Sequence, residues 1–144
     1  MSTSAALARY LQLNADYNYY VLQEAFYAQK HESMTALISK WEKRDSEWTK
    51  AQEDCAELEE GKTKTWNHKE YTYDEADDYA DAKVGFSEAE IEQALEECTE
   101  LDIEYDTMMS MYDALIEEIK TDKEATKSLV QKGAQDNGLL GGGG

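Results

Sequence analysis

The chain has 144 residues, 41% of them hydrophobic, no proline, and a formal net charge of −18 at pH 7. This length suits one domain with a modest core, and a chain without proline favours uninterrupted helices. The charge is uneven, because residues 51–100 contain seventeen acidic and four basic residues, a net of −13. Such a surface repels nucleic acid and anionic lipid, so we expect neither as a direct partner.

A heptad repeat predicts one long helix over residues from about 5 to 60. Its second apolar position is less regular, because Glu24, His31, Asp45 and Gln52 interrupt it. We expect Gly61 to end this helix, and the polar stretch 29–33 is where a kink or break is expected. Eight consecutive residues at the first position are apolar: Ala6, Leu13, Tyr20, Tyr27, Met34, Trp41, Trp48 and Cys55.

The N-terminal half of this helix is apolar on more than one side. Leu7, Leu11, Val21, Leu22 and Phe26 all lie off the main stripe, which indicates a second apolar face and a second partner. We therefore expect self-association or docking to another protein through residues 5–41. For each candidate, burial against the second helix of the same chain is the alternative. The candidate interface residues are Tyr10, Tyr17, Tyr20, Phe26, Tyr27, Met34 and Trp41.

Residues 61–86 form the connector to a second helix. Thr, Trp and Tyr between Lys62 and Tyr73 favour a small β-hairpin with a turn at Asn67-His68, and an irregular loop or a helical turn is the alternative. We expect Asp74 to cap a short acidic helix that runs to Lys83 and ends at Gly85. The weakly apolar face of that helix would consist of Tyr73, Ala76, Tyr79, Ala80 and Val84.

The second long helix is predicted over residues from about 87 to 132. Ser87 and Glu90 form a capping-box pattern, and Phe86 and Ile91 form a hydrophobic staple around it. We expect Gly133 to end the helix and residues 134–144 to form a flexible glycine-rich tail. The apolar stripe of this helix comprises Ile91, Leu95, Cys98, Leu101, Tyr105, Met108 or Met109, Tyr112, Leu115 or Ile116, and Ile119.

The predicted fold class is all-α, a long antiparallel coiled-coil-like helical hairpin in which each stripe buries the other. Residues 1–133 would form one domain. If Gly61 faces Ser87, the register keeps Cys55 more than a turn from Cys98, so we expect two buried thiols rather than a disulfide.

The sequence lacks the spacing of known catalytic and metal-binding motifs, and we expect no catalytic residue, metal or cofactor. His31 and His68 are interpreted as polar surface residues. The acidic cluster of Asp74, Asp77 and Asp78, with Asp81, is an alternative functional feature. It would occupy a basic surface of a partner, as an inhibitor or a nucleic-acid mimic, whereas its simpler interpretation is a solvated helix face.

The sequence shows neither a cleaved signal peptide nor a run of about twenty apolar residues that would span a membrane. The default location is the cytoplasm, and export without a cleaved signal is left open. We expect a non-enzymatic protein that self-assembles or binds another protein through the helical hairpin.

Overall fold

The computed structural model describes residues 2–136, and the chain in this range is mostly helical, as predicted. Two compact units can be distinguished: the chain up to Lys30 together with the chain from Glu104 onward, and the segment His31–Ile103 between them. The predicted tail over 137–144 lies outside the described residues. In order, the elements are α1 (Thr3–Ala56), β1 (Lys64–Trp66), β2 (Lys69–Tyr71), the 3-10 helix η1 (Tyr73–Glu75), α2 (Ala76–Val84) and α3 (Glu88–Asp136).

The long heptad of α1 forms its inner face, as predicted. The helix is continuous through residues 29–33, where a break was expected, and the boundary between the two units falls in the same stretch. A period of 3.5 residues keeps the first heptad position on one side of the helix over its whole length. None of its eight residues is exposed, and Ala6, Leu13, Trp48 and Cys55 are fully buried.

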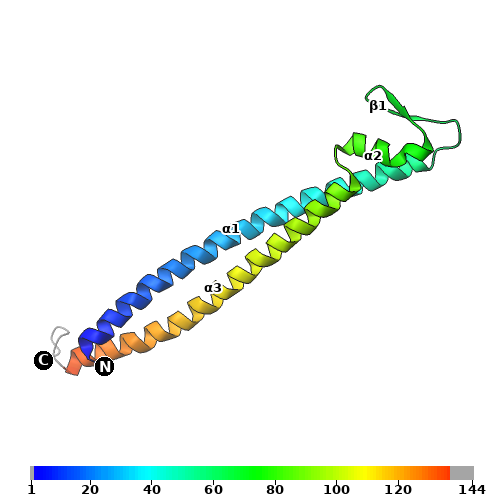
Figure 1. Cartoon of the computed structure of the whole chain (residues 1–144). Coiled ribbons are helices and arrows are strands. Elements are labelled where there is room, and N and C mark those ends of the chain that lie inside the picture. The colour runs from blue at the N-terminus through cyan, green and yellow to red at the C-terminus, as the bar shows by residue number, and fades with distance from the viewer. Residues whose placement is uncertain (1, 137–144) are drawn as a thin grey trace. The chain divides into compact units, whose positions relative to one another are not determined.

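In the first unit, the N-terminal turns of α1 lie against the C-terminal turns of α3, so the two helices run antiparallel (Figure 1). Tyrosine rings fill the space between them. The rings of Tyr27 and Tyr112 stack with centroids 5.9 Å apart, and Tyr20 and Tyr105 continue the row on either side. Burial, together with the neighbouring Tyr19, raises the pKa of the Tyr112 hydroxyl above its ordinary value.

In the second unit, the connector folds onto the two long helices and completes a cluster of buried side chains. Trp48 lies in this cluster, and its indole N–H donates a 2.8 Å hydrogen bond to Asp81 of α2. Ile91 of α3 is wholly buried there, and Phe86 packs edge-on against Trp41 with ring centroids 4.8 Å apart. The cluster comprises Trp48, Ala51, Cys55, Tyr71, Ala76, Tyr79, Ala80 and Ile91.

The connector contains the β-hairpin, and not the irregular loop or helical turn that the sequence left open. Strands β1 and β2 pair antiparallel, with Lys64 opposite Tyr71. Asn67 and His68 between them have φ of 48° and 66°. A positive φ at both central residues is the mark of a type I′ turn, whose twist matches that of paired strands. Gly85 ends α2 as predicted, in the left-handed conformation at φ 89°.

Helix α3 begins as the sequence indicates. Its first residue follows Ser87, whose hydroxyl oxygen accepts a 3.1 Å hydrogen bond from the Glu90 N–H and donates one of 3.2 Å to the Glu90 carboxylate. In a full capping box the carboxylate reaches the backbone N–H of the cap residue, whereas here it meets the Ser87 hydroxyl. Phe86, the outer member of the predicted staple, packs against the cluster of buried side chains to which Ile91 belongs.

Three predicted boundaries are wrong. α1 ends at Ala56 rather than near residue 60, because Leu58 turns back, its N–H bonding to the Cys55 carbonyl, and packs against the core. α2 begins at Ala76 with Glu75 rather than Asp74 as its N-cap, and it follows the 3-10 helix η1, which is capped by Thr72, whose N–H donates a 3.1 Å bond to Glu75. α3 continues through Gly133 to Asp136, so the first residues of the predicted tail are helical.

Candidate interaction surfaces

Most of the predicted interface residues lie on the inner side of α1. Tyr10, Tyr17, Tyr20, Tyr27, Met34 and Trp41 are half-buried, whereas Phe26 is 49% exposed. Tyr17, Tyr20 and Tyr27 contact side chains of α3, which is the alternative that the sequence left open for them. Phe26 is the most exposed member of the predicted set.

Four exposed apolar residues of α1 in the first unit lie on the side opposite its inner face. Leu7, Leu11 and Leu22 are 44%, 58% and 68% exposed, and Phe26 belongs with them. At 3.6 residues per turn these four fall within an arc of about 100°, on the side opposite Ala6 and its heptad partners. We call this surface the outer face of α1. It consists of Leu7, Leu11, Ala15, Asn18, Leu22 and Phe26, all of them exposed.

The outer face carries no charge, although 32% of the chain's residues are charged. Residues 2–30 contain four charged side chains, and all of them fall outside its arc. Glu24 and Asp16 are half-buried, and the Lys30 ammonium lies 5.4 Å from the centre of the Phe26 ring at one end. The sequence signal for this surface was the set of apolar residues off the main heptad.

Three of the four residues of the predicted acidic docking face are exposed, and the fourth is not. Asp74, Asp77 and Asp78 are exposed, but Asp81 is half-buried and accepts the hydrogen bond from the Trp48 indole. Asp81 therefore holds α2 onto α1. The three exposed carboxylates remain candidates for contact with a basic surface.

A second group of carboxylates gathers around Glu88 at the start of α3. The pKa of Glu88 is raised above its ordinary value by burial first and then by Glu92, with further contributions from Asp77 and Asp45. These acidic residues belong to α3, α2 and α1, so the tertiary structure brings together negative charge from all three helices of the second unit.

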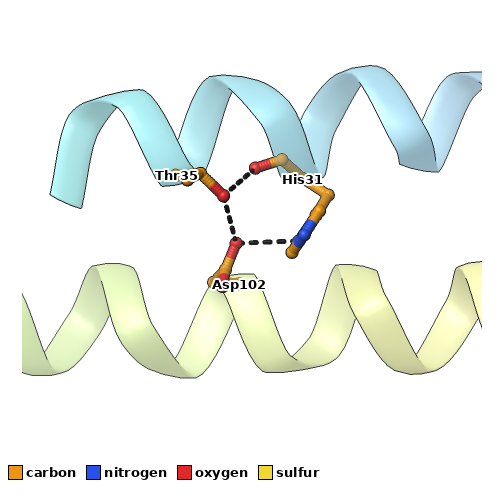
Figure 2. Close-up of polar contacts among 3 residues, drawn as sticks. All are labelled: His31, Thr35 and Asp102. Atoms are coloured by element: carbon orange, nitrogen blue, oxygen red, sulfur yellow. Dashed lines mark hydrogen bonds and ion pairs between the residues drawn. The ribbon is translucent and has the colours of Figure 1, made fainter. Parts of the chain in front are cut away.

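A polar cluster lies between α1 and α3 at the start of the second unit. Figure 2 shows the Asp102 carboxylate between the His31 imidazole, at 2.8 Å, and the Thr35 hydroxyl, at 3.3 Å. The Thr35 hydroxyl is also 3.0 Å from the backbone carbonyl of His31. His31 and Asp102 are 32% and 25% exposed, so this pair is half-buried rather than on the surface as His31 was predicted to be.

The arrangement of these three residues does not match that of a catalytic triad. In such a triad the imidazole lies between the hydroxyl and the carboxylate, and removes the proton from the hydroxyl. Here the carboxylate is the central group and Thr35 has no contact with the imidazole ring in Figure 2. The cluster instead resembles the polar contacts that set the register of paired helices.

Asp102 was missed by sequence reasoning, which assigned Leu101 to the inner stripe. Leu101 is exposed and Asp102 is turned inward. A usable signal was present, because the second heptad position of α1 contains His31, and a polar residue at an inner position calls for a polar partner.

The two cysteines are separate buried thiols. The Cys55 thiol donates a 3.3 Å hydrogen bond to the carbonyl of Thr72, and burial raises its pKa above the ordinary value. Cys98 is buried on the inner face of α3. A raised pKa keeps a thiol protonated and slow to react, so Cys55 is part of the packing of the connector.

Within residues 2–136, no group of three or more histidine, cysteine or acidic side chains is arranged to hold a metal ion. None of the helices in that range has a stretch long and apolar enough to cross a membrane. Comparison with protein-family models, curated protein sequences and solved structures finds no match.

Proposed function

We propose that this chain is a non-enzymatic protein-binding protein that docks through the outer face of α1. The observation that carries this proposal is an exposed, uncharged apolar surface on a chain with a net charge of −18. Exposed apolar area costs about 25 cal/mol per Å² relative to burial, and a continuous patch of it is typical of an interaction site.

The stability of α1 supports this role. Its inner side is packed against α3 within the first unit, so the outer residues are held on a helix that is already formed. A partner then meets side chains in place and does not have to order a flexible segment, which lowers the entropic cost of binding.

Site-specific photo-crosslinking in cells that produce the protein tests the proposal. A photoreactive benzophenone side chain replaces Leu22, the most exposed leucine of the outer face. The matched control carries the same group in place of Glu97, which is exposed on α3. We expect covalent adducts with a protein from the Leu22 position and none from the Glu97 position, whether the adduct joins two copies or two different proteins.

Absence of adducts from Leu7, Leu11, Leu22 and Phe26 alike would contradict docking through this face. Adducts from the Glu97 position at equal yield would show that the crosslinking is unspecific.

An acidic inhibitor that occupies a basic surface is the second candidate function. It is favoured by the gathering of Asp45, Asp77, Glu88 and Glu92 from three helices, where burial first and then the neighbouring carboxylates raise the pKa of Glu88. Carboxylates at such density attract basic proteins and raise their rate of association.

This candidate is tested with the exposed aspartates alone, because Asp81 binds Trp48 and its loss would perturb the fold. The Asp74→Asn/Asp77→Asn/Asp78→Asn variant should lose any basic proteins that the natural chain retains in an affinity capture. Recovery of the same proteins by both chains, or of none by either, would exclude the acidic docking role.

A further inference from the structure

The outer face of α1 has a symmetric sequence. About the midpoint between Asp16 and Tyr17, Leu7 corresponds to Phe26, Leu11 to Leu22, and Ala15 to Asn18. The larger apolar side chains lie toward both ends and the smaller ones in the middle. A two-fold interface requires a self-complementary surface, because residue i must meet residue j while j meets i, and this arrangement places large apolar side chains opposite large ones and small side chains opposite small ones.

We infer that the partner of the outer face is a second copy of this chain, paired antiparallel about that midpoint. This inference rests on the proposed function and names its partner. In the pair, Leu11 of each copy meets Leu22 of the other, and Leu7 meets Phe26. The contact extends over the stretch from Leu7 to Phe26, about 28 Å at 1.5 Å per residue.

The centre of the face allows the helices to approach closely. Ala15 and Asn18 are both small and exposed, and small residues at a helix crossing let side chains above and below interdigitate. Each Asn18 lies beside the two-fold axis, where its amide can bond to the other copy. A polar residue in this position favours one register over its neighbours, as buried asparagine does in coiled coils.

The absence of charge on the outer face favours a second copy of this chain over a basic partner protein. Residues 2–30 contain Arg9, Lys30, Asp16 and Glu24, which balance to zero, whereas residues 51–100 carry a net of −13. Two copies of a chain with a net charge of −18 can meet at low electrostatic cost where the surface is neutral. A basic partner would find no carboxylate on the outer face.

Sedimentation equilibrium of the purified full chain tests the pairing. We expect a dimer at high micromolar concentration, and a dissociation constant raised about a hundredfold or more by Leu11→Glu/Leu22→Glu, which places four carboxylates in the contact. Leu129→Glu is the matched control, because Leu129 is 48% exposed on α3 of the same unit, and it should remain dimeric. Unchanged far-UV circular dichroism would show that the variants are folded.

The direction of pairing is tested by placing opposite charges at the same two positions. In an antiparallel dimer of Leu11→Lys/Leu22→Glu, each new ammonium faces a new carboxylate, so this variant should dimerise at least about tenfold more tightly than Leu11→Glu/Leu22→Glu or Leu11→Lys/Leu22→Lys. In a parallel dimer like charges would face each other, and all three variants would be equally weak. That second result would overturn the antiparallel pair.

A strictly monomeric natural chain, or one whose dimer survives Leu11→Glu/Leu22→Glu unchanged, would overturn self-pairing through this face. The proposed docking function would still stand if the crosslinker at Leu22 attached a different protein. The proposed docking function would be contradicted, independently of the pairing, if no crosslinked adduct formed.

Discussion

At the scale of single residues, the structural role of Gly133 differs from the one that the sequence alone indicates. Glycine near the end of a helical pattern ordinarily marks the stop, because it adopts the left-handed conformation without strain. Here α3 continues through it. A Cβ on Gly133 would lie 2.5 Å from the Thr3 hydroxyl oxygen and 3.4 Å from the Thr3 Cβ. The glycine is therefore needed for close approach of α1 and α3.

The prediction for Gly133 is a double-mutant cycle with Thr3. Alanine in place of helical glycine stabilises by about 0.5–1 kcal/mol when nothing obstructs it. We expect this gain for Gly133→Ala in the Thr3→Ala background, and a smaller gain or a loss in the natural chain. Urea denaturation of the four proteins measures the difference. Equal effects in both backgrounds would show that the two residues do not touch.

At the scale of elements, the pairing of α1 with α3 combines apolar heptads with polar contacts. Stacked tyrosines fill the inner positions of the first unit, and His31 with Asp102 occupies them at the start of the second. Apolar contacts alone tolerate a shift of register better than a polar pair does, because a shifted polar group loses its partner.

The prediction for the polar pair is a favourable coupling between His31 and Asp102. Each single variant, His31→Leu or Asp102→Leu, leaves the other group half-buried without its partner. The double variant removes both and should unfold at a urea concentration close to that of the natural chain. We expect a coupling free energy of about 0.5–1.5 kcal/mol from the four unfolding curves. Effects that add within about 0.3 kcal/mol would show that the pair contributes nothing.

At the scale of the whole molecule, the dominant electrostatic fact is a net charge of −18. Mutual repulsion of carboxylates opposes the folded state and is screened by salt, so stability should rise with ionic strength. The effect is concentrated where acidic residues converge, and Glu88 is the best marker of it because its pKa is raised by burial and then by Glu92.

The prediction for Glu88 is a pH-dependent gain in stability on replacement. A carboxyl whose pKa is raised on folding costs stability when ionised, so the cost is present above its folded pKa and absent below its ordinary value of 4.5. Glu88→Ala should therefore be more stable at neutral pH than Glu90→Ala, and this advantage should shrink as the pH falls through that range.

Glu90 is the matched control because it lies in the same first turn, where both carboxylates interact with the helix dipole, and it bonds to Ser87. Thermal unfolding at several pH values measures the difference. A gap between the variants that does not change with pH would contradict the assignment to ionisation of Glu88.

The features that follow from local chemistry were predictable. The Ser87 cap, the Asn67-His68 turn and the stop at Gly85 depend on what a few neighbouring side chains do to their own backbone. The inner face of α1 was predictable for a related reason, since a repeat of seven places its members on one side whatever the partner is. These together imply the helical hairpin.

The features that depend on a neighbour distant in sequence were decided by the tertiary structure. Leu101 and Asp102 are separated by about 100° around α3, so a small rotation of the helix decides which one faces α1. That rotation is set by packing, and it turns Asp102 toward His31. In the same way, only the folded connector brings Asp81 to Trp48, which removes it from the acidic docking face.

The outer face of α1 likewise depends partly on the sequence alone and partly on the tertiary structure. The sequence by itself determined that the N-terminal half of α1 has more apolar residues than one stripe needs, because hydrophobicity and helical period are local properties. Only the tertiary structure decided which stripe faces α3. The tyrosines at Tyr20 and Tyr27 pack against it, and Leu11, Leu22 and Phe26 remain exposed, because one helix can cover one side of another and leaves the opposite side to solvent or to a partner.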